Sequence, residues 1–194
     1  MTPEELAHLI AHLDDMVDHE NDAGITDGWM LLQLLRLMDA TSLSASDCLR
    51  LTYADISDDF DENRIEVWVG EGEKRRRIQA DIDAVGVFET LRRTPGHRYP
   101  VDIAAQILRE RREIILPDQF LFLPQYSRDE AASRMEGMFY HLIELGGTCA
   151  LGWDRHTLAS VVSASIIRRF ETTPLAQLAK ATGATQDQLC EFLP

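Results

Sequence analysis

The densest cluster of cations in the sequence is the run Lys74–Arg77, in which one lysine precedes three arginines. Lysine and arginine side chains neutralise phosphate groups, so the run is a candidate surface for contact with a polyanion. Alternate residues of a strand point to opposite faces, so Lys74 and Arg76 should share one face and Arg75 and Arg77 the other. The alternative interpretation is a solvated hairpin whose cations pair with its own glutamates, which are Glu66, Glu71 and Glu73.

His8 and His12 lie four residues apart, a spacing that places two imidazoles on one face of a helix. Such a pair can bind a divalent metal only if a third and a fourth ligand join it, and Asp15 is a candidate for one of them. Because the sequence does not offer a complete ligand set, it predicts no metal site and no cofactor.

The three cysteines are odd in number and scattered, at Cys48, Cys149 and Cys190, which favours buried thiols in a reducing compartment. The first residues, Met1–Glu5, lack the basic region and the apolar run of a signal peptide. The most apolar stretch, residues 29–38, contains two polar residues and is too short to span a bilayer. We therefore expect a cytoplasmic protein with no membrane partner.

The elements that must position these residues are mostly helical by pattern. Apolar residues recur at spacings of three and four in most segments, whereas residues 64–69 alternate between apolar and polar as a strand does. We expect strands over 64–69 and 74–79 and helices over 2–17, 27–39, 46–51, 82–93, 101–115, 128–145, 153–170, 174–182 and 186–193. The predicted fold class is mainly α with one small antiparallel β-hairpin, in a single domain over residues 1–194.

The composition is that of a globular protein, with 45% hydrophobic and 27% charged residues in 194, and a chain of this length buries about 70% of its unfolded surface. Its formal net charge is −14, and residues 1–62 hold 15 acids but only two bases. This balance counts against a stand-alone protein that coats nucleic acid or adsorbs to an anionic membrane. The acids alternate with apolar residues, which indicates an acidic face on folded helices rather than a tail.

Several segments resemble, in the same order, motifs of the tyrosine recombinases, the phage integrase family. Residues 37–51, LMDATSLSASDCLRL, are similar to the family's "LLYATGLRISELLAL", and residues 53–56 match the "W-x-D-I" that follows. The hairpin segment 69–74 resembles "V-x-G-K-G-x-K", and residues 120–122, 152–160 and 181–186 resemble "xLF", "HDLRHTFAS" and "LGHSSI". The resemblance spans residues 2–194 and implies the catalytic-domain fold of the family, the DNA breaking-rejoining fold, without its N-terminal clamp domain.

The resemblance also implies where the family's catalytic groups would lie. In that family a tyrosine attacks a DNA phosphodiester, while arginines, a lysine and histidines stabilise the transition state. The corresponding positions, in chain order, fall on Ser44, Glu71, Gly152, Arg155, Gly183 and Phe192. Only Arg155 matches the family, so the resemblance implies a degenerate site with no catalytic residues, and we expect a chain that is not an enzyme.

Alternative assignments remain open at several of these positions. A shift of two residues would bring Cys190 to the nucleophile position, and Lys74 would replace the hairpin lysine in a shifted register. Neither shift restores the family's site, because Ser44, Gly152 and Gly183 would still lack the required groups, so an active enzyme would need a rearranged site. Arg155 is either a phosphate ligand or a structural arginine paired with an acid, and His156 is interpreted as a packed or capping residue. The tryptophans are interpreted as core or interface residues, at Trp29, Trp68 and Trp153.

The function implied is that of a DNA-binding or regulatory accessory factor for a mobile element or a recombinase. It would contact duplex DNA through Lys74–Arg77 and Arg155. The alternative is an acidic protein-interaction module that binds or inhibits a recombinase or another partner without binding DNA. Such a module would use its C-terminal helix, 186–193, toward a recombinase or a copy of itself. The sequence indicates no small-molecule substrate.

Overall fold

The computed structural model describes residues 1–20, 27–56, 64–70, 72–93, 118–124, 126–145, 156–170 and 172–191 of the chain. Helix α1 (Pro3–Glu20) begins at a capping box, because the backbone N–H of Thr2 donates to Oε2 of Glu5 and the N–H of Glu5 donates back to Thr2 Oγ1. Four residues of its apolar face are fully buried, which are Leu6, Leu9, Leu13 and Val17. Their spacing of three and four is the reason that α1 packs on one side only.

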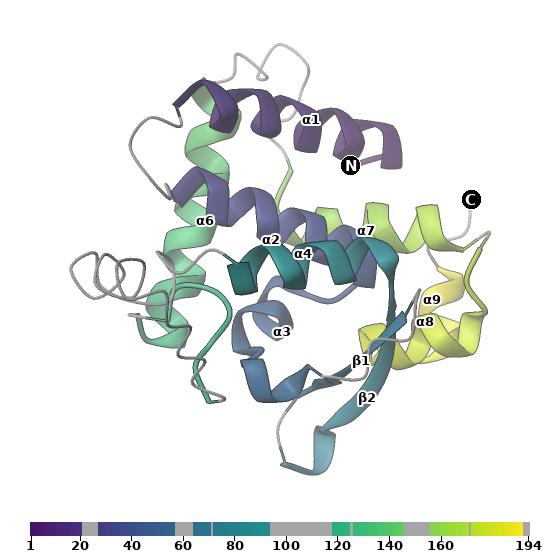
Figure 1. Ribbon diagram of the computed structural model, residues 1–194. Helices are drawn as coiled ribbons and strands as arrows, with labels where there is room; N and C mark the ends of the chain where they lie inside the picture. The colour runs from purple at the N-terminus through teal and green to yellow at the C-terminus, as the bar shows by residue number, and fades with distance from the viewer. Residues whose placement is uncertain are drawn as a thin grey trace.

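Helix α2 (Asp27–Thr41) is the central helix of the molecule. It packs against α1, α4 (Ile82–Arg93), α6 (Arg128–Leu145) and α7 (Leu158–Arg169). Every residue from Met30 to Leu35 is buried, as are Leu37 and Met38, so the helix is apolar nearly all round, as its leucine-rich sequence requires. Figure 1 shows α1 above α2, with α4 and α7 alongside it.

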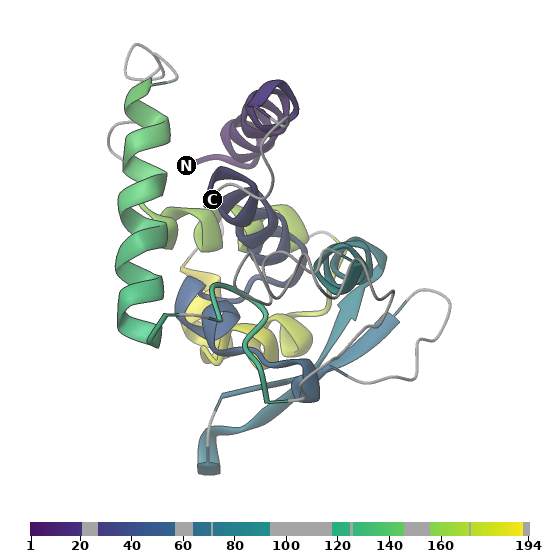
Figure 2. The same cartoon turned by 60° about the vertical axis from the view of Figure 1, so that its left-hand side comes forward.

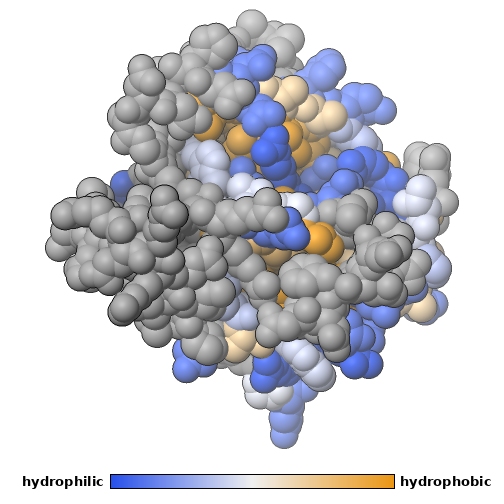
Figure 3. All heavy atoms as spheres, in the orientation of Figure 1, coloured by the Kyte–Doolittle hydropathy of each residue, from blue (hydrophilic) through white to orange (hydrophobic). Residues whose placement is uncertain are grey.

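The β-hairpin consists of strands β1 (Arg64–Val69) and β2 (Arg76–Asp81), paired antiparallel with Val69 opposite Arg76. A 3₁₀ turn, η2 (Gly72–Lys74), joins them, and Gly70 and Gly72 adopt φ values of 89° and 54°, a region that favours glycine. The inner face of the hairpin is buried on the helices through Ile65, Val67, Val69, Ile78 and Ala80. The tip of the hairpin projects from the rest of the molecule in Figure 1. Figure 3 shows this projecting end as hydrophilic.

Between α2 and the hairpin lie the short helix α3 (Ala45–Arg50) and the 3₁₀ turn η1 (Tyr53–Asp55). A β-bridge joins Thr52 to Phe120, and Leu121–Leu123 are buried beside them, so this segment lies close to the start of α6. Figure 2 shows α6 along the left side of the molecule and the hairpin along its lower edge.

The C-terminal helices α8 (Leu175–Thr182) and α9 (Gln186–Cys190) form a small unit of their own. A separate apolar cluster of Ile166, Leu178 and Leu189 joins them to the end of α7. Helix α8 also contacts strand β2, so the unit lies against the hairpin as well as against α7 (Figure 1).

The fold class predicted from the sequence is confirmed, since the described residues are mostly helical with a two-stranded antiparallel sheet. Several bounds differ from the prediction: β2 runs over Arg76–Asp81 rather than 74–79 because η2 occupies Gly72–Lys74, and α1, α2, α8 and α9 differ at their ends. Helix α3 starts at Ala45 because Ser44, not Ser46, caps it, and α7 starts at Leu158 because Thr157 caps it. The helix predicted over 101–115 lies outside the described residues. Within the described part, the helices lack the combination of length and hydropathy that a membrane crossing needs.

Candidate nucleic-acid interface

The outward face of the hairpin carries Glu66 and Trp68 on β1 and Arg75 and Arg77 on and beside β2. Trp68 is 41% exposed, so the interpretation as a core residue is wrong for this tryptophan. Arg77 lies directly opposite Trp68 in the register. The guanidinium carbons of Arg75 and Arg77 lie 5.3 and 5.9 Å from the indole centroid, within the range of cation–π attraction.

Each of these two arginines also pairs with one acid. Arg77 Nη1 lies 3.1 Å from Oε2 of Glu66, and Arg75 Nη2 lies 2.9 Å from Oδ1 of Asp55. Pairing with Glu66 was among the expected alternatives, whereas Asp55 was not a predicted partner. Both arginine side chains remain about half exposed, so solvent weakens the pairs and other N–H groups stay accessible.

The alternation predicted for the basic run is confirmed at Arg76, which faces inward while its two neighbours face outward. Its guanidinium joins three elements, because Nε donates to the carbonyl of Lys180, and Nη2 donates to the carbonyl of Ala181 and to Oδ2 of Asp47. Strand β2 is thereby linked to α8 and to α3. Nothing is described of the side chain of Lys74.

Ser44 and Gly183, two positions assigned by the family resemblance, both serve as helix caps. Ser44 Oγ accepts a hydrogen bond from the backbone N–H of Asp47 at 3.0 Å. Gly183 ends α8 with a φ of 73°, and its N–H donates to the carbonyl of Ala179. The two positions lie on either side of Arg76, since Asp47 is one turn after Ser44 and a Cβ added to Gly183 would lie 3.5 Å from Cζ of Arg76.

The other assigned positions, Glu71, Gly152, Arg155 and Phe192, lie outside the described residues, as do Trp153 and Cys149. Cys190 is exposed on α9. His156 precedes the N-cap of α7, and its Nε2 lies 3.3 Å from Oε2 of Glu5, which links α7 to α1.

Arg128, at the start of α6, was missed by sequence reasoning. It donates hydrogen bonds to the backbone carbonyls of four residues, Leu49, Phe122, Leu123 and Tyr126, and its Cζ lies 3.7 Å from the Phe120 ring centroid. Burial lowers the pKa of this guanidinium from its ordinary value. No spacing signal points to it, because its acceptors are carbonyls of irregular segments that any residue type supplies.

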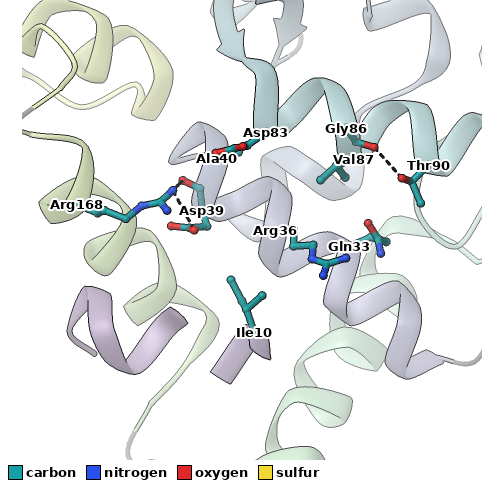
Figure 4. A pocket seen from close by; sticks show the side chains of 10 residues that line it. All are labelled: Ile10, Gln33, Arg36, Asp39, Ala40, Asp83, Gly86, Val87, Thr90 and Arg168. Carbon is teal, nitrogen blue, oxygen red and sulfur yellow. Dashed lines mark hydrogen bonds and ion pairs between the residues drawn. The ribbon is translucent and has the colours of Figure 1, made fainter. Parts of the chain in front are cut away.

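A second polar region is a cavity of about 430 Å³ between α1, α2, α4 and α7, shown in Figure 4. Its polar side chains include Gln33, Arg36 and Asp39 on one face of α2 and Arg168 from α7. The charges here pair internally, with Arg168 3.0 Å from Asp39 and Arg36 2.7 Å from Asp14. Apolar atoms show between α1 and the helices below it on the same side of the molecule in Figure 3.

The fold is that of the tyrosine recombinases, as solved structures show. The chain is similar to XerH site-specific recombinase bound to its difH substrate in a pre-cleavage complex, at 14% identity and a TM-score of 0.62 over 100% of this chain and 50% of that one. It is similar to the same recombinase in a post-cleavage complex, at 13% identity and 0.61, over 99% and 48%. It is also similar to the Tn1549 transposon integrase in complex with transposon right end DNA, at 13% and 0.65, over 100% and 61%.

The chain thus spans about half the length of the XerH structures it matches. No family model matches the sequence, and no curated protein matches it. The likeness is therefore one of fold, carried by three-dimensional structure rather than by sequence.

These comparisons contradict the expectation that the chain is not an enzyme. The structural neighbours are a site-specific recombinase, in pre-cleavage and post-cleavage complexes, and a transposon integrase, so the fold is one that enzymes of this kind adopt. The expectation rested on residue types at aligned positions. At 13–14% identity such an alignment does not fix which side chain enters a catalytic site, and four of the six positions lie outside the described residues.

Proposed function

We propose that this chain is a recombinase-like protein that binds duplex DNA in site-specific recombination, beside or within a recombinase assembly. The observation that carries the proposal is the match of 99–100% of the chain to proteins whose structures contain DNA. The outward hairpin face supports it, because Arg75 and Arg77 flank an exposed Trp68 at the projecting end of the molecule.

The affinity should be modest and sensitive to salt. Arg75 and Arg77 by themselves would displace at most about two counterions from the DNA, which contributes about −1.8 to the slope of log K against log salt. Binding at about 50 mM salt should therefore weaken about tenfold at about 200 mM. The excess of acid in residues 1–62 lowers the affinity for DNA further and disfavours sequence-independent binding along DNA.

The test is a titration on duplex DNA at these two salt concentrations, combined with a nicked suicide substrate that traps a covalent protein–DNA adduct. Salt-sensitive binding supports the proposal, and an adduct in the same reactions identifies this chain as the cutting protein. Binding weaker than millimolar at the lower salt concentration overturns it.

A second candidate function is contact with a basic partner, such as another recombinase, through the acidic helices. The favouring observation is the charge of residues 1–62, whose 15 acids include the exposed Glu4 on α1. Light scattering of the chain mixed with a recombinase tests this candidate. A complex whose mass is the sum of the two proteins supports partner binding and is compatible with DNA binding. Separate masses at micromolar concentration overturn partner binding.

A further inference from the structure

Arg76 lies at the junction of α3, β2 and α8, apart from the outward arginines of the hairpin. Three of its five N–H groups are fixed, by Asp47 at 3.0 Å and by the carbonyls of Lys180 and Ala181 at 2.9 Å each. An arginine held by three acceptors from two other elements is locked in one orientation before any ligand arrives. Little conformational entropy is then lost when its remaining N–H groups bind a partner.

The remaining edge of the guanidinium is open. Nη1 makes no hydrogen bond or ion pair with the residues that the structure describes. Gly183 lies beside it, and a Cβ there would lie 3.5 Å from Cζ and 3.7 Å from Nη1, so the absence of a side chain leaves this face uncovered. Gly183 itself is exposed, and the Arg76 side chain is 21% exposed, so part of this side chain is accessible to solvent beside Gly183.

The charge around this edge sets what it can bind. Asp47, the carboxylate partner, is itself partly exposed, so the ion pair is screened and its carboxylate competes with an incoming anion for the same guanidinium. The two free N–H groups on Nη1 diverge, so each can donate one charge-assisted hydrogen bond to a phosphate oxygen. Among the described residues no aromatic ring lies in cation–π range of this guanidinium, so no stacking platform for a base adjoins it there.

We propose that Arg76 is a phosphate ligand of this chain, oriented by Asp47 and by the end of α8, with Nη1 over Gly183 as the contacting edge. The proposal rests on the proposed function, because the phosphate would belong to the backbone of bound duplex DNA. The family resemblance would place an arginine at position 44, but this chain has a serine there that caps α3. In the proposal the phosphate-binding cation at this junction is instead Arg76 of strand β2.

The experiment is a double-mutant cycle of Arg76→Gln and Asp47→Asn, read by duplex DNA binding at two salt concentrations. R76Q should weaken binding several-fold and reduce the salt slope by about one. D47N should tighten binding about threefold, because it removes the competing carboxylate and keeps an oxygen that accepts from Nη2. In the double variant the gain from D47N should vanish, since it acts only through Arg76.

The matched control is the pair Arg168 and Asp39, whose Nη2–Oδ2 distance is also 3.0 Å and whose Nη2 also donates to a backbone carbonyl. R168Q and D39N should leave the salt slope unchanged. If D47N weakens binding, or if its gain persists beside R76Q, Arg76 is only a structural link and the proposal fails. Should R76Q not fold, the D47N result on the folded protein still decides the outcome.

Thermal unfolding in inorganic phosphate separates this proposal from the proposed function. Phosphate should raise the melting temperature of the wild type and of D47N, but not that of R76Q, relative to equal ionic strength in chloride. If phosphate stabilises the protein but no DNA binding is found, the proposed function is refuted and the phosphate site at Arg76 is supported. If DNA binds, R76Q leaves the salt slope unchanged and phosphate does not stabilise the protein, the site at Arg76 is refuted and the proposed function is supported.

Discussion

At the scale of single residues, arginines as well as hydrophobic contacts join segments of this chain that are distant in sequence. Arg76 connects three elements with one guanidinium, and Arg128 binds carbonyls on both sides of the bridge between Thr52 and Phe120. Buried carbonyls without a donor are costly, so such arginines are expected wherever chain segments lack the regular pairing of a helix or sheet.

Replacement of Arg128 by methionine should therefore destabilise the protein. The four backbone carbonyls lose a charged donor, and the expected fall in the free energy of unfolding is about 3 kcal/mol, measured by urea denaturation. Arg134→Met on the same helix is the control, since that side chain is exposed and its Cζ lies 5.1 Å from the Tyr126 ring centroid, at the protein surface. A fall for R128M no larger than that for R134M would show that water replaces the lost donors.

The described cysteines should differ sharply in reactivity. Cys48 is fully buried, and burial together with the nearby charge of Asp47 raises the pKa of its thiol well above the ordinary value, so little thiolate exists at pH 8. Cys190 is exposed on α9. In a thiol titration of the native protein with an aromatic disulfide, C190S should lose one fast-reacting group, whereas C48S should show no change until the protein is unfolded. Loss of a fast group in native C48S would contradict the buried environment.

At the scale of elements, the periodicity of apolar residues was sufficient to predict the bounds of a helix or strand that buries one face. It predicted α4 and α6 at their observed bounds, and β1 likewise, because their apolar spacing is set by burial. It failed at α3 and α7, where the start depends on which of several hydroxyls accepts a backbone hydrogen bond. It gave no sign of η1 or of the Arg128 contacts, which depend on backbone atoms.

Replacement of Gly86 and of Gly183 by alanine should change the stability of the protein in opposite directions. Gly86 lies inside α4 with open space around it, so Gly86→Ala should stabilise the protein by about 0.5–1 kcal/mol through helix propensity. Gly183 ends α8 at a φ of 73°, so Gly183→Ala should cost about 1 kcal/mol through backbone strain. Thermal unfolding checks both, and two shifts of the same sign would contradict the role of Gly183 as a left-handed cap.

At the scale of the whole molecule, part of the acidic excess lies far from the hairpin, on α1, although Asp47 and Asp55 contact the hairpin arginines. Residues 1–62 carry a large excess of acid, and α1 lies at the end of the molecule away from the hairpin, as Figures 1 and 2 both show. The net charge of −14 was predictable from composition, but its separation from the outward arginines was not, because it depends on how α1 packs across α2. Composition alone therefore overstates how strongly this chain should repel DNA.

That separation leads to a prediction about which acids oppose DNA binding. At physiological salt the Debye length is about 8 Å, so distant charges are screened and adjacent ones are not. Glu66 lies 3.1 Å from Arg77, so Glu66→Gln should free this cation and tighten binding to duplex DNA about threefold. The double variant Glu4→Gln/Asp15→Asn removes two charges from α1 and should change the dissociation constant less than about 1.5-fold under the same conditions.

Both variants should be compared again at low salt, where the Debye length grows to about 30 Å at about 0.01 M. There the α1 variant should begin to tighten binding as well, because its field then reaches the hairpin. An α1 effect as large as that of E66Q at physiological salt would mean that DNA lies against the acidic helices and not against the hairpin. The location of the binding surface is thus decided by the salt dependence of two charge changes, independently of whether either variant alters cleavage.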